Sequence, residues 1–232
     1  MKYAYQFIRE YLHTQAGIML GAEKDYLIES RLHGLLKKYS LKDLEQLVCV
    51  LESTPDGDVA SSVISSLTTH ETSWFRDQRP FDRFRTEVLP NLRARQRRQI
   101  SIWSAACSTG QEIYSIAMLL REEGIHSPMW QVSLCASDIC KTTLSQAQQG
   151  VYSRFEIERG LPQTYLQRYF EMTPAGWRIS SDLRQSVRFE AANLIRLPAT
   201  PERFDVIFCR NVLIYFDQTV QRKVLQNLHD RL

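Results

Sequence analysis

Two short apolar runs break sharply into polar residues and then into a helical pattern, and this feature constrains the fold more than any other. The first run lies in Ile100–Tyr114 (ISIWSAACSTGQEIY), and the second lies in Phe204–Phe216 (FDVIFCRNVLIYF). Strand-to-helix junctions of this kind predict a doubly wound α/β sheet, in which ligands bind at the carboxyl ends of parallel strands. We therefore expect the ligand-binding residues to follow these two strands.

The first junction contains a turn suited to a nucleotide-like ligand. Ser108, Thr109 and Gly110 form the turn, and the glycine lets the backbone approach a ligand closely. One glycine stands in place of the three in the dinucleotide fingerprint, and no lysine–serine or lysine–threonine pair follows. A ligand without a pyrophosphate fits this turn better, and S-adenosylmethionine is the one we expect.

Composition indicates an ordinary soluble protein with room for a real core. The chain has 232 residues, of which 44% are hydrophobic and 24% are charged. No apolar run approaches the roughly 20 residues of a membrane span, and the N-terminus lacks the apolar core of a signal peptide. We therefore expect a cytoplasmic protein with no direct membrane insertion.

The cysteines do not suggest a metal or redox site. None of them forms a C-x-x-C pair, and four lie in or beside predicted strands; the five are Cys49, Cys107, Cys135, Cys140 and Cys209. We expect buried, reduced thiols and predict no metal ligand.

The arginines are concentrated between Arg76 and Arg98. This stretch holds eight arginines and three acids, although the net charge of the whole chain is only +3. Such a cluster favours an anionic ligand or partner, and the alternative is a solvated helix face.

Helical and strand patterns divide the chain into three parts. Residues 1–67 carry amphipathic stripes, residues 68–98 form a linking segment with a helix that ends near Pro90 or soon after, and residues 99–232 alternate strands with helices. Main-sheet strands are predicted at about 100–105, 131–136, 187–191 and 204–209. Residues 151–185 interrupt the alternation with a short helix and a hairpin around Pro174–Gly176.

Four strings in this order carry a resemblance to a known family. They are LTTHETSWFRD (67–77), WSAACSTGQEIYSIAM (103–118), ASD (136–138) and FCRNVLIYFD (208–217). Together they resemble the CheR family, the chemoreceptor glutamate methyltransferases of bacterial chemotaxis-type signalling. The match runs from about Tyr5 to the last residue.

The resemblance implies both a fold and an activity. It implies a Rossmann-like methyltransferase sheet with a small N-terminal helical receptor-docking domain (1–67) and an inserted β-subdomain (151–185). The activity is S-adenosylmethionine-dependent methyl esterification of glutamates on the cytoplasmic region of chemoreceptors, by a monomer. The family sheet has seven strands, so we expect the C-terminal strands to be missing from this chain and strand 205–209 to lie at a sheet edge.

Two acids are candidate cofactor ligands. Asp138 ends the second strand, where an acid accepts hydrogen bonds from a ribose diol; the alternative is a helix N-cap. Glu112 stands in the first helical turn after Gly110, and the resemblance implies a cofactor contact. Its alternative is an acid favoured there by the helix dipole.

The segment 68–77 supplies further expected contacts. The resemblance places His70, Thr72 and Arg76 over the cofactor, although His70 stands where asparagine is commoner in the family. Arg76, the candidate catalytic residue, holds the cofactor's carboxylate or places the receptor glutamate, and its alternative is a surface salt bridge. Trp74 and Phe75 are expected to pack.

Polar residues after the third and fourth strands complete the predicted cofactor site. Asn193 and Leu194 are expected at the adenine end, and Arg210 and Asn211 at the carboxyl edge of the sheet. The alternative for the last two is a helix cap and a loop salt bridge. The Asn-Pro-Pro-Tyr motif of DNA amino-methylating enzymes is absent here, which argues against a DNA base as acceptor. We expect no nucleic-acid partner.

Docking and two rival functions remain as hypotheses. A basic face of the second helix (Arg31, Lys37 and Lys38) is the expected docking surface for acidic receptor helices. The hairpin around Pro174 looks shorter than in members that bind a receptor C-terminal peptide, so we predict no such binding. The rivals are a module that binds cofactor without transfer, and a methyltransferase for a nucleic acid or small molecule.

Overall fold

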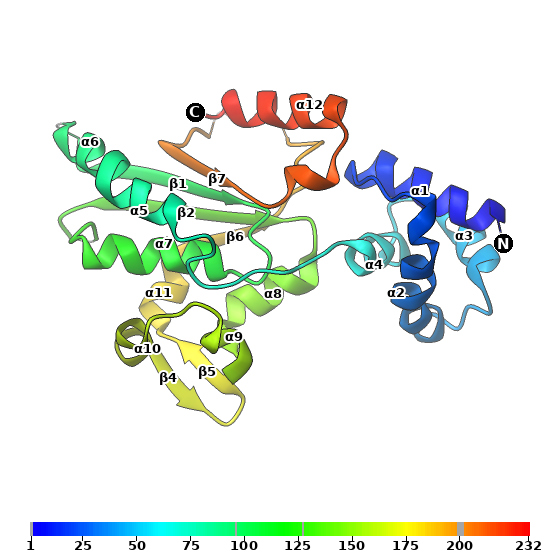
Figure 1. Ribbon diagram of the computed structural model, residues 1–232, viewed down its shortest axis with the longest axis horizontal. Coiled ribbons are helices and arrows are strands. Elements are labelled where there is room, and N and C mark those ends of the chain that lie inside the picture. The colour runs from blue at the N-terminus through cyan, green and yellow to red at the C-terminus, as the bar shows by residue number, and fades with distance from the viewer. Residues whose placement is uncertain (1, 96, 127, 199–201) are drawn as a thin grey trace. The chain divides into compact units, whose positions relative to one another are not determined.

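The computed structural model describes residues 2–95, 97–126, 128–198 and 202–232. Contacts divide the chain into two compact units (Figure 1). The first consists of Met1–Thr69, Asn193–Leu197 and Asn211–Asn227. The second consists of His70–Ala192, Pro198–Arg210 and Leu228–Leu232. Within the described residues, no helix is both long enough and apolar enough to cross a bilayer.

Helices dominate the first unit. Those of its N-terminal part are α1 (Lys2–Ala16), the short 3₁₀ helix η1 (Ala22–Lys24), α2 (Asp25–Lys38), α3 (Leu44–Ser53) and α4 (Asp58–Leu67). The apolar stripes predicted from sequence are their buried faces, as Leu12, Leu32 and Leu47 show with no exposed surface. Helix α3 begins after Asp43, whose carboxylate accepts the Gln46 N–H at 2.9 Å.

A parallel four-stranded sheet forms the centre of the second unit. Its strands are β1 (Gln99–Ala105), β2 (Gln131–Asp138), β6 (Val187–Ala191) and β7 (Val206–Cys209), in the order β6-β2-β1-β7. The chain moves outward from β1 through β2 to β6 and then returns to the other side of β1. The strand order therefore reverses between β1 and β7, the position at which open α/β sheets bind ligands.

Two helices follow the central strands of this sheet. Helix α7 (Gln111–Glu122) follows β1 and helix α8 (Lys141–Gln149) follows β2; both lie along the same side of the sheet (Figure 1). Both helices fit the alternation of strands and helices predicted for residues 99–232. β7 lies at the end of the described sheet, as expected for strand 205–209.

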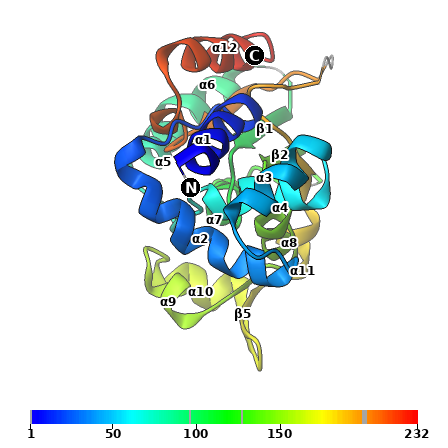
Figure 2. The same cartoon turned by 90° about the vertical axis from the view of Figure 1, so that its right-hand side faces the viewer.

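An antiparallel three-stranded sheet is inserted between β2 and β6. It consists of β3 (Val151–Tyr152), β5 (Gly176–Ile179) and β4 (Phe170–Thr173) in that order, with the helices α9 (Arg154–Glu158), α10 (Gln163–Tyr169) and α11 (Ser181–Gln185). Figure 2 shows the hairpin that contains β5 projecting beyond α10 and α11. The predicted hairpin and the short helix α10 are confirmed. The strand β3 was not expected, because two residues are too few to show a period.

The remaining helices are the linking helix before β1 and the helices that follow β7. The linking helix continues through α5 (Arg79–Arg83), a π-helical turn η2 (Phe84–Val88) and α6 (Leu89–Ala94). In the π-helical turn directly before Pro90, the Leu89 N–H donates to the Phe84 carbonyl, and the helix ends at Ala94, soon after this proline, as expected. The 3₁₀ helix η3 (Leu213–Tyr215) and the helix α12 (Gln218–His229) follow β7.

The inserted sheet approaches the segment that precedes α5 very closely. A Cβ atom at Gly160, which follows α9, would lie 2.3 Å from the carbonyl oxygen of Trp74. The Trp74 ring packs edge-on against Tyr152 and Phe170, with ring centroids 4.9 and 5.3 Å away. Trp74 is therefore a packing residue, as predicted, and it joins the insert to the rest of the second unit.

This close approach predicts a large cost for a side chain at Gly160. Gly160 and Gly124 both have left-handed φ angles, +95° and +68°, but a Cβ at Gly124 would meet nothing within 4 Å. Gly124→Ala should therefore cost only the backbone strain of about 1–2 kcal/mol. Gly160→Ala should cost about 1–3 kcal/mol more because backbone must move. Urea unfolding of both variants measures the difference, and equal losses would contradict the close approach.

Candidate functional site

The loop between β1 and α7 adopts a strained backbone that is tied to the end of β2. Ala106, Ser108 and Gly110 have φ angles of +64°, +51° and +93°. The Cys107 N–H donates to the Ser137 carbonyl at 2.9 Å. Non-glycine residues persist in this conformation only when the surrounding structure enforces it. The loop at residues 106–110 is thus a fixed feature of the carboxyl edge of the sheet.

Asp138 enforces this loop directly. Its side chain accepts the Ser108 N–H at 2.8 Å on one oxygen and the Cys140 N–H at 2.9 Å on the other. The N-cap of α8 is Cys140, so Asp138 is not the helix cap that was the alternative from sequence. Asp138 is largely buried. Each of its oxygens still has a lone pair for another donor, such as a sugar hydroxyl.

Glu112 and Arg210 form a buried ion pair at the carboxyl edge where the strand order reverses. Glu112 accepts from the Ser104 hydroxyl at 2.8 Å and from the Arg210 guanidinium at 2.9 Å. The two side chains are only 12% and 16% exposed. Burial raises the pKa of Glu112, while the Ser104 hydrogen bond and the Arg210 charge oppose that rise. Glu112 is therefore more than a first-turn acid favoured by the helix dipole.

Arg210 also holds the segment that precedes α5. Its second guanidinium nitrogen donates to the Arg76 carbonyl at 2.6 Å and to the Asp77 carboxylate at 2.9 Å. Its guanidinium carbon lies 5.5 Å from the centre of the Phe81 ring. The loop salt bridge considered for Arg210 from sequence is thus present.

The segment 70–76 lies against the same loop. The His70 carbonyl accepts the Ser108 hydroxyl at 2.8 Å, and the Phe75 N–H donates to the Ser115 hydroxyl at 3.1 Å. Arg76 and Thr72 are half-buried. Arg76 donates to the Glu71 carbonyl at 2.8 Å, and no carboxylate of the described residues lies within ion-pair distance of its guanidinium. Its charge is therefore not neutralised by direct ion pairing.

Three predicted cofactor residues belong to the first unit. The Asn193 amide donates to the Gln15 carbonyl at 2.7 Å, Leu194 is buried, and Asn211 is exposed with a φ of +57°. Asn193 comes two residues after β6 and Asn211 two residues after β7. Their contact with the cofactor stays a prediction.

Of the three predicted docking residues, one binds to a neighbouring helix and two are exposed. The Arg31 guanidinium donates to the Leu67 and Thr68 carbonyls, both at 3.0 Å, at the C-terminal end of α4. Arg31 is therefore a helix-capping residue, which its sequence position on a basic face did not reveal. Lys37 and Lys38 are exposed in the last turn of α2.

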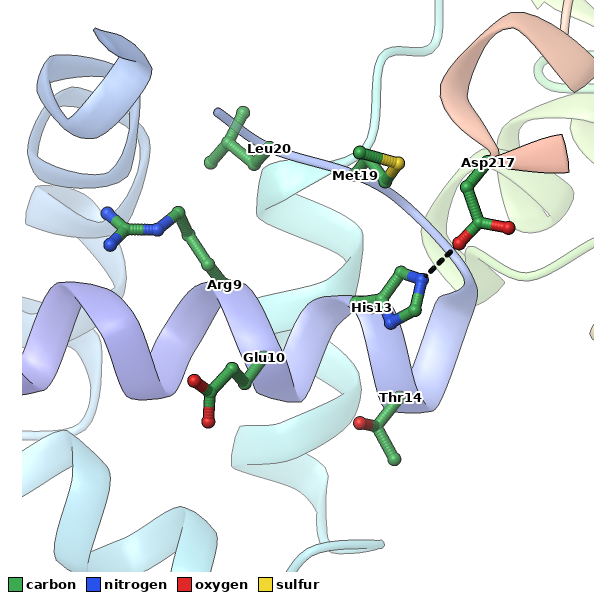
Figure 3. Close-up of a pocket in the computed structure, with 7 residues that line it drawn as sticks. All are labelled: Arg9, Glu10, His13, Thr14, Met19, Leu20 and Asp217. Atoms are coloured by element: carbon green, nitrogen blue, oxygen red, sulfur yellow. Dashed lines mark hydrogen bonds and ion pairs between the residues drawn. The ribbon is translucent and has the colours of Figure 1, made fainter. Parts of the chain in front are cut away.

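A pocket of about 570 Å³ in the first unit was not predicted from sequence (Figure 3). Its lining comes from α1, the segment after it and the residue before α12, and consists of Arg9, Glu10, His13, Thr14, Met19, Leu20 and Asp217. His13 and Asp217 are 2.7 Å apart, and Arg9 pairs with Asp25. Since Arg9, His13 and Asp217 already have partners within the protein, we assign no ligand to this pocket. The sequence did not reveal this pocket because its lining residues come from segments about 200 positions apart, which no local motif links.

Thiols and acids form no metal site in the described part of the chain. No group of three or more His, Cys, Asp or Glu residues there is placed to hold an ion. No disulfide joins the five cysteines, all of which lie in the described ranges; Cys107, Cys135 and Cys140 are buried and Cys209 is half-buried. Cys49 is exposed, so the expectation of a buried thiol is wrong at that position, which lies on the outer face of α3.

Comparisons with known proteins cover nearly the whole chain. Residues 70–232 match the family described as CheR methyltransferase, SAM binding domain, and residues 4–68 match CheR methyltransferase, all-alpha domain. Chemotaxis protein methyltransferase Cher2 of Pseudomonas putida is 38% identical over 234 residues, 98% of this chain and 85% of that protein. Chemotaxis protein methyltransferase 1 of Pseudomonas aeruginosa is 38% identical over 233 residues, with the same shares. The chemotaxis protein methyltransferase of Vibrio parahaemolyticus is 37% identical, over 98% of this chain and 84% of that protein.

The raised pKa of Glu112 predicts how stability depends on pH. The folded protein holds the Glu112 proton more tightly than the unfolded chain does. Stability is therefore lost as pH rises from the ordinary pKa of a glutamate through the raised pKa of Glu112. Glu112→Gln lacks this titration. In urea unfolding between pH 4 and 7, the free energy of unfolding of the variant should therefore rise relative to that of the wild type as pH rises. Any difference between the two proteins that does not depend on pH leaves this trend unchanged.

Glu122→Gln, on the same helix, is the matched control. A hydrogen bond from Tyr169 lowers the pKa of Glu122, so its contribution is present above the ordinary pKa and is lost as pH falls through the lowered value. The wild type should gain stability relative to this variant as pH rises. The same direction in both variants would contradict the opposite environments of the two carboxylates.

Proposed function

The chain belongs to the CheR methyltransferase family, and on this premise we propose that it transfers methyl groups to glutamate side chains of chemoreceptors. It is an S-adenosylmethionine-dependent methyltransferase of chemotaxis signalling. The glutamate acceptor is the finer part of this proposal. Its support is the charge and hydrogen bonding of the residues at the candidate site.

The residues at the carboxyl edge of the sheet fit this cofactor. Asp138 has lone pairs left for ribose hydroxyls after binding two backbone amides. The loop at 106–110 presents backbone at the end of β1, the usual place for a nucleoside in such sheets. Glu112 offers a carboxylate to the amino group of an amino-acid moiety, and Arg210 orients that carboxylate. S-adenosylmethionine, when bound, supplies an activated methyl group.

Arg76 carries the proposal of an anionic acceptor. It is half-buried and has no ion-pair partner among the described carboxylates, whereas Arg210 is neutralised by Glu112 and Asp77. A partly desolvated cation without a direct counter-charge favours an anion in its reach. Arg76 therefore binds the cofactor's carboxylate or places the receptor glutamate, the roles predicted from the sequence.

Methyl transfer to a glutamate requires no general base from the enzyme. A glutamate side chain has an ordinary pKa of about 4.3 and is already ionised at neutral pH. Glu112 is held by Ser104 and Arg210 and is thus not a free base. The chain's contribution is alignment of the carboxylate with the methyl group, and such positioning supplies up to about 7–11 kcal/mol in intramolecular reactions.

Methyl transfer to a receptor tests the acceptor. With radiolabelled S-adenosylmethionine, we expect label on a chemoreceptor cytoplasmic fragment, none on a fragment whose methylated glutamates are changed to alanine, and none on RNA. Alkali should release the label as methanol, because esters hydrolyse and N-methyl groups do not. Asp138→Ala should reduce methyl transfer. Asp182→Ala is the control: it removes an acid that pairs with Arg121, outside the candidate site, and should leave transfer unchanged. Alkali-stable label, or label on RNA, would refute the glutamate acceptor.

Lys37 and Lys38 are the proposed receptor-docking residues that remain exposed on α2. Single surface charges contribute little, so the double reversal Lys37→Glu/Lys38→Glu should act through association rate. We expect transfer to the receptor fragment at low salt to fall about 3- to 10-fold and its salt dependence to flatten. Arg222→Glu/Lys223→Glu, an exposed adjacent pair on α12, is the control. Equal effects of the two reversals would place docking elsewhere.

A further inference from the structure

A tyrosine of the inserted sheet reaches the candidate cofactor loop. The Tyr152 hydroxyl donates to the Thr109 carbonyl at 2.9 Å, across 43 residues of sequence. Tyr152 ends β3, and Thr109 lies in the strained loop between β1 and α7. The insert therefore supplies a hydrogen bond to a loop that otherwise belongs to the main sheet.

The loop needs anchors on more than one side. β2 accepts the N–H groups of Cys107 and Ser108, on the Ser137 carbonyl and the Asp138 carboxylate, and so holds the stretch that contains the left-handed Ala106 and Ser108. The bond from Tyr152 holds the next carbonyl, that of Thr109, from the opposite end of the turn. Because a peptide unit is planar, fixing this carbonyl also fixes the direction of the Gly110 N–H.

Tyr152 is itself held rigidly enough to act as an anchor. It has no exposed surface, and it pairs with Trp177 of β5 in the antiparallel ladder. Gly150, at φ +61°, turns the chain from α8 into β3, and a Cβ there would lie 2.6 Å from the Ile179 side chain. The Trp74 ring packs edge-on against it. Burial raises the pKa of Tyr152 well above its usual value, so the hydroxyl remains a donor.

We propose that Tyr152 is a positioning residue for cofactor binding, which acts by fixing the Thr109 carbonyl and with it the turn at residues 108–110. This inference rests on the proposed placement of the cofactor at that loop. It makes the inserted sheet a part of the cofactor site, in addition to any role the insert has in contacting receptors.

Tyr152→Phe tests the proposal, with Tyr114→Phe as the matched control. Tyr114 is also fully buried, and its hydroxyl donates at 2.8 Å to the Ala147 carbonyl in α8. Each variant thus loses one buried hydroxyl–carbonyl bond and keeps its ring. Both should lower the unfolding midpoint by similar amounts. Only Tyr152→Phe should weaken S-adenosylhomocysteine binding, by about 3- to 10-fold.

Kinetics and amide exchange separate positioning from general stability. Tyr152→Phe should raise the KM for S-adenosylmethionine with little change in kcat, since a binding contact common to ground and transition states is lost. In the cofactor-free protein, it should also speed hydrogen exchange of the amides at 106–110, while Tyr114→Phe should not. Wild-type affinity in Tyr152→Phe, or equal weakening in both variants, would overturn the proposal. Failure of the wild-type chain itself to bind S-adenosylhomocysteine would instead refute the proposed cofactor site.

Discussion

The strained loop at residues 106–110 is the constraint around which the second unit is organised. It places backbone at the end of β1 in a conformation that non-glycine residues avoid, so other elements must hold it there. β2 holds it through Asp138, the inserted sheet holds it through Tyr152, and the loop's own Ser108 hydroxyl holds the His70 carbonyl. Three segments distant in sequence thereby meet at one edge of the sheet.

Asp138 shows that structural and binding roles coincide at this edge. Its carboxylate binds two backbone amides, which fixes both the loop and the start of α8, yet lone pairs remain for a ligand. The side chain is thus already oriented before any ligand arrives. Such preorganisation reduces the entropy that binding must overcome.

The Glu112–Arg210 pair joins the first turn of α7 to the residue that follows β7, and Arg210 extends this link to Asp77 in the segment before α5. A buried ion pair stabilises a fold only when its remaining donors and acceptors are satisfied. Here Ser104 satisfies Glu112, and the Asp77 carboxylate and the Arg76 carbonyl satisfy Arg210. Among the described residues, no carboxylate lies within ion-pair distance of Arg76, which distinguishes it chemically from Arg210.

The sequence by itself determined the elements, because hydrophobic period and turn residues are local. The stripes of α1 to α4, the strands β1, β2 and β6, and the acids at the ends of strands all followed from spacing within about ten residues. Only the tertiary structure decided the partners. The bonds from Arg31 to Leu67, from Tyr152 to Thr109 and from Arg210 to Glu112 join residues 36, 43 and 98 positions apart. No local pattern records such pairings, since a side chain's partner depends on which distant segment the packed core brings beside it.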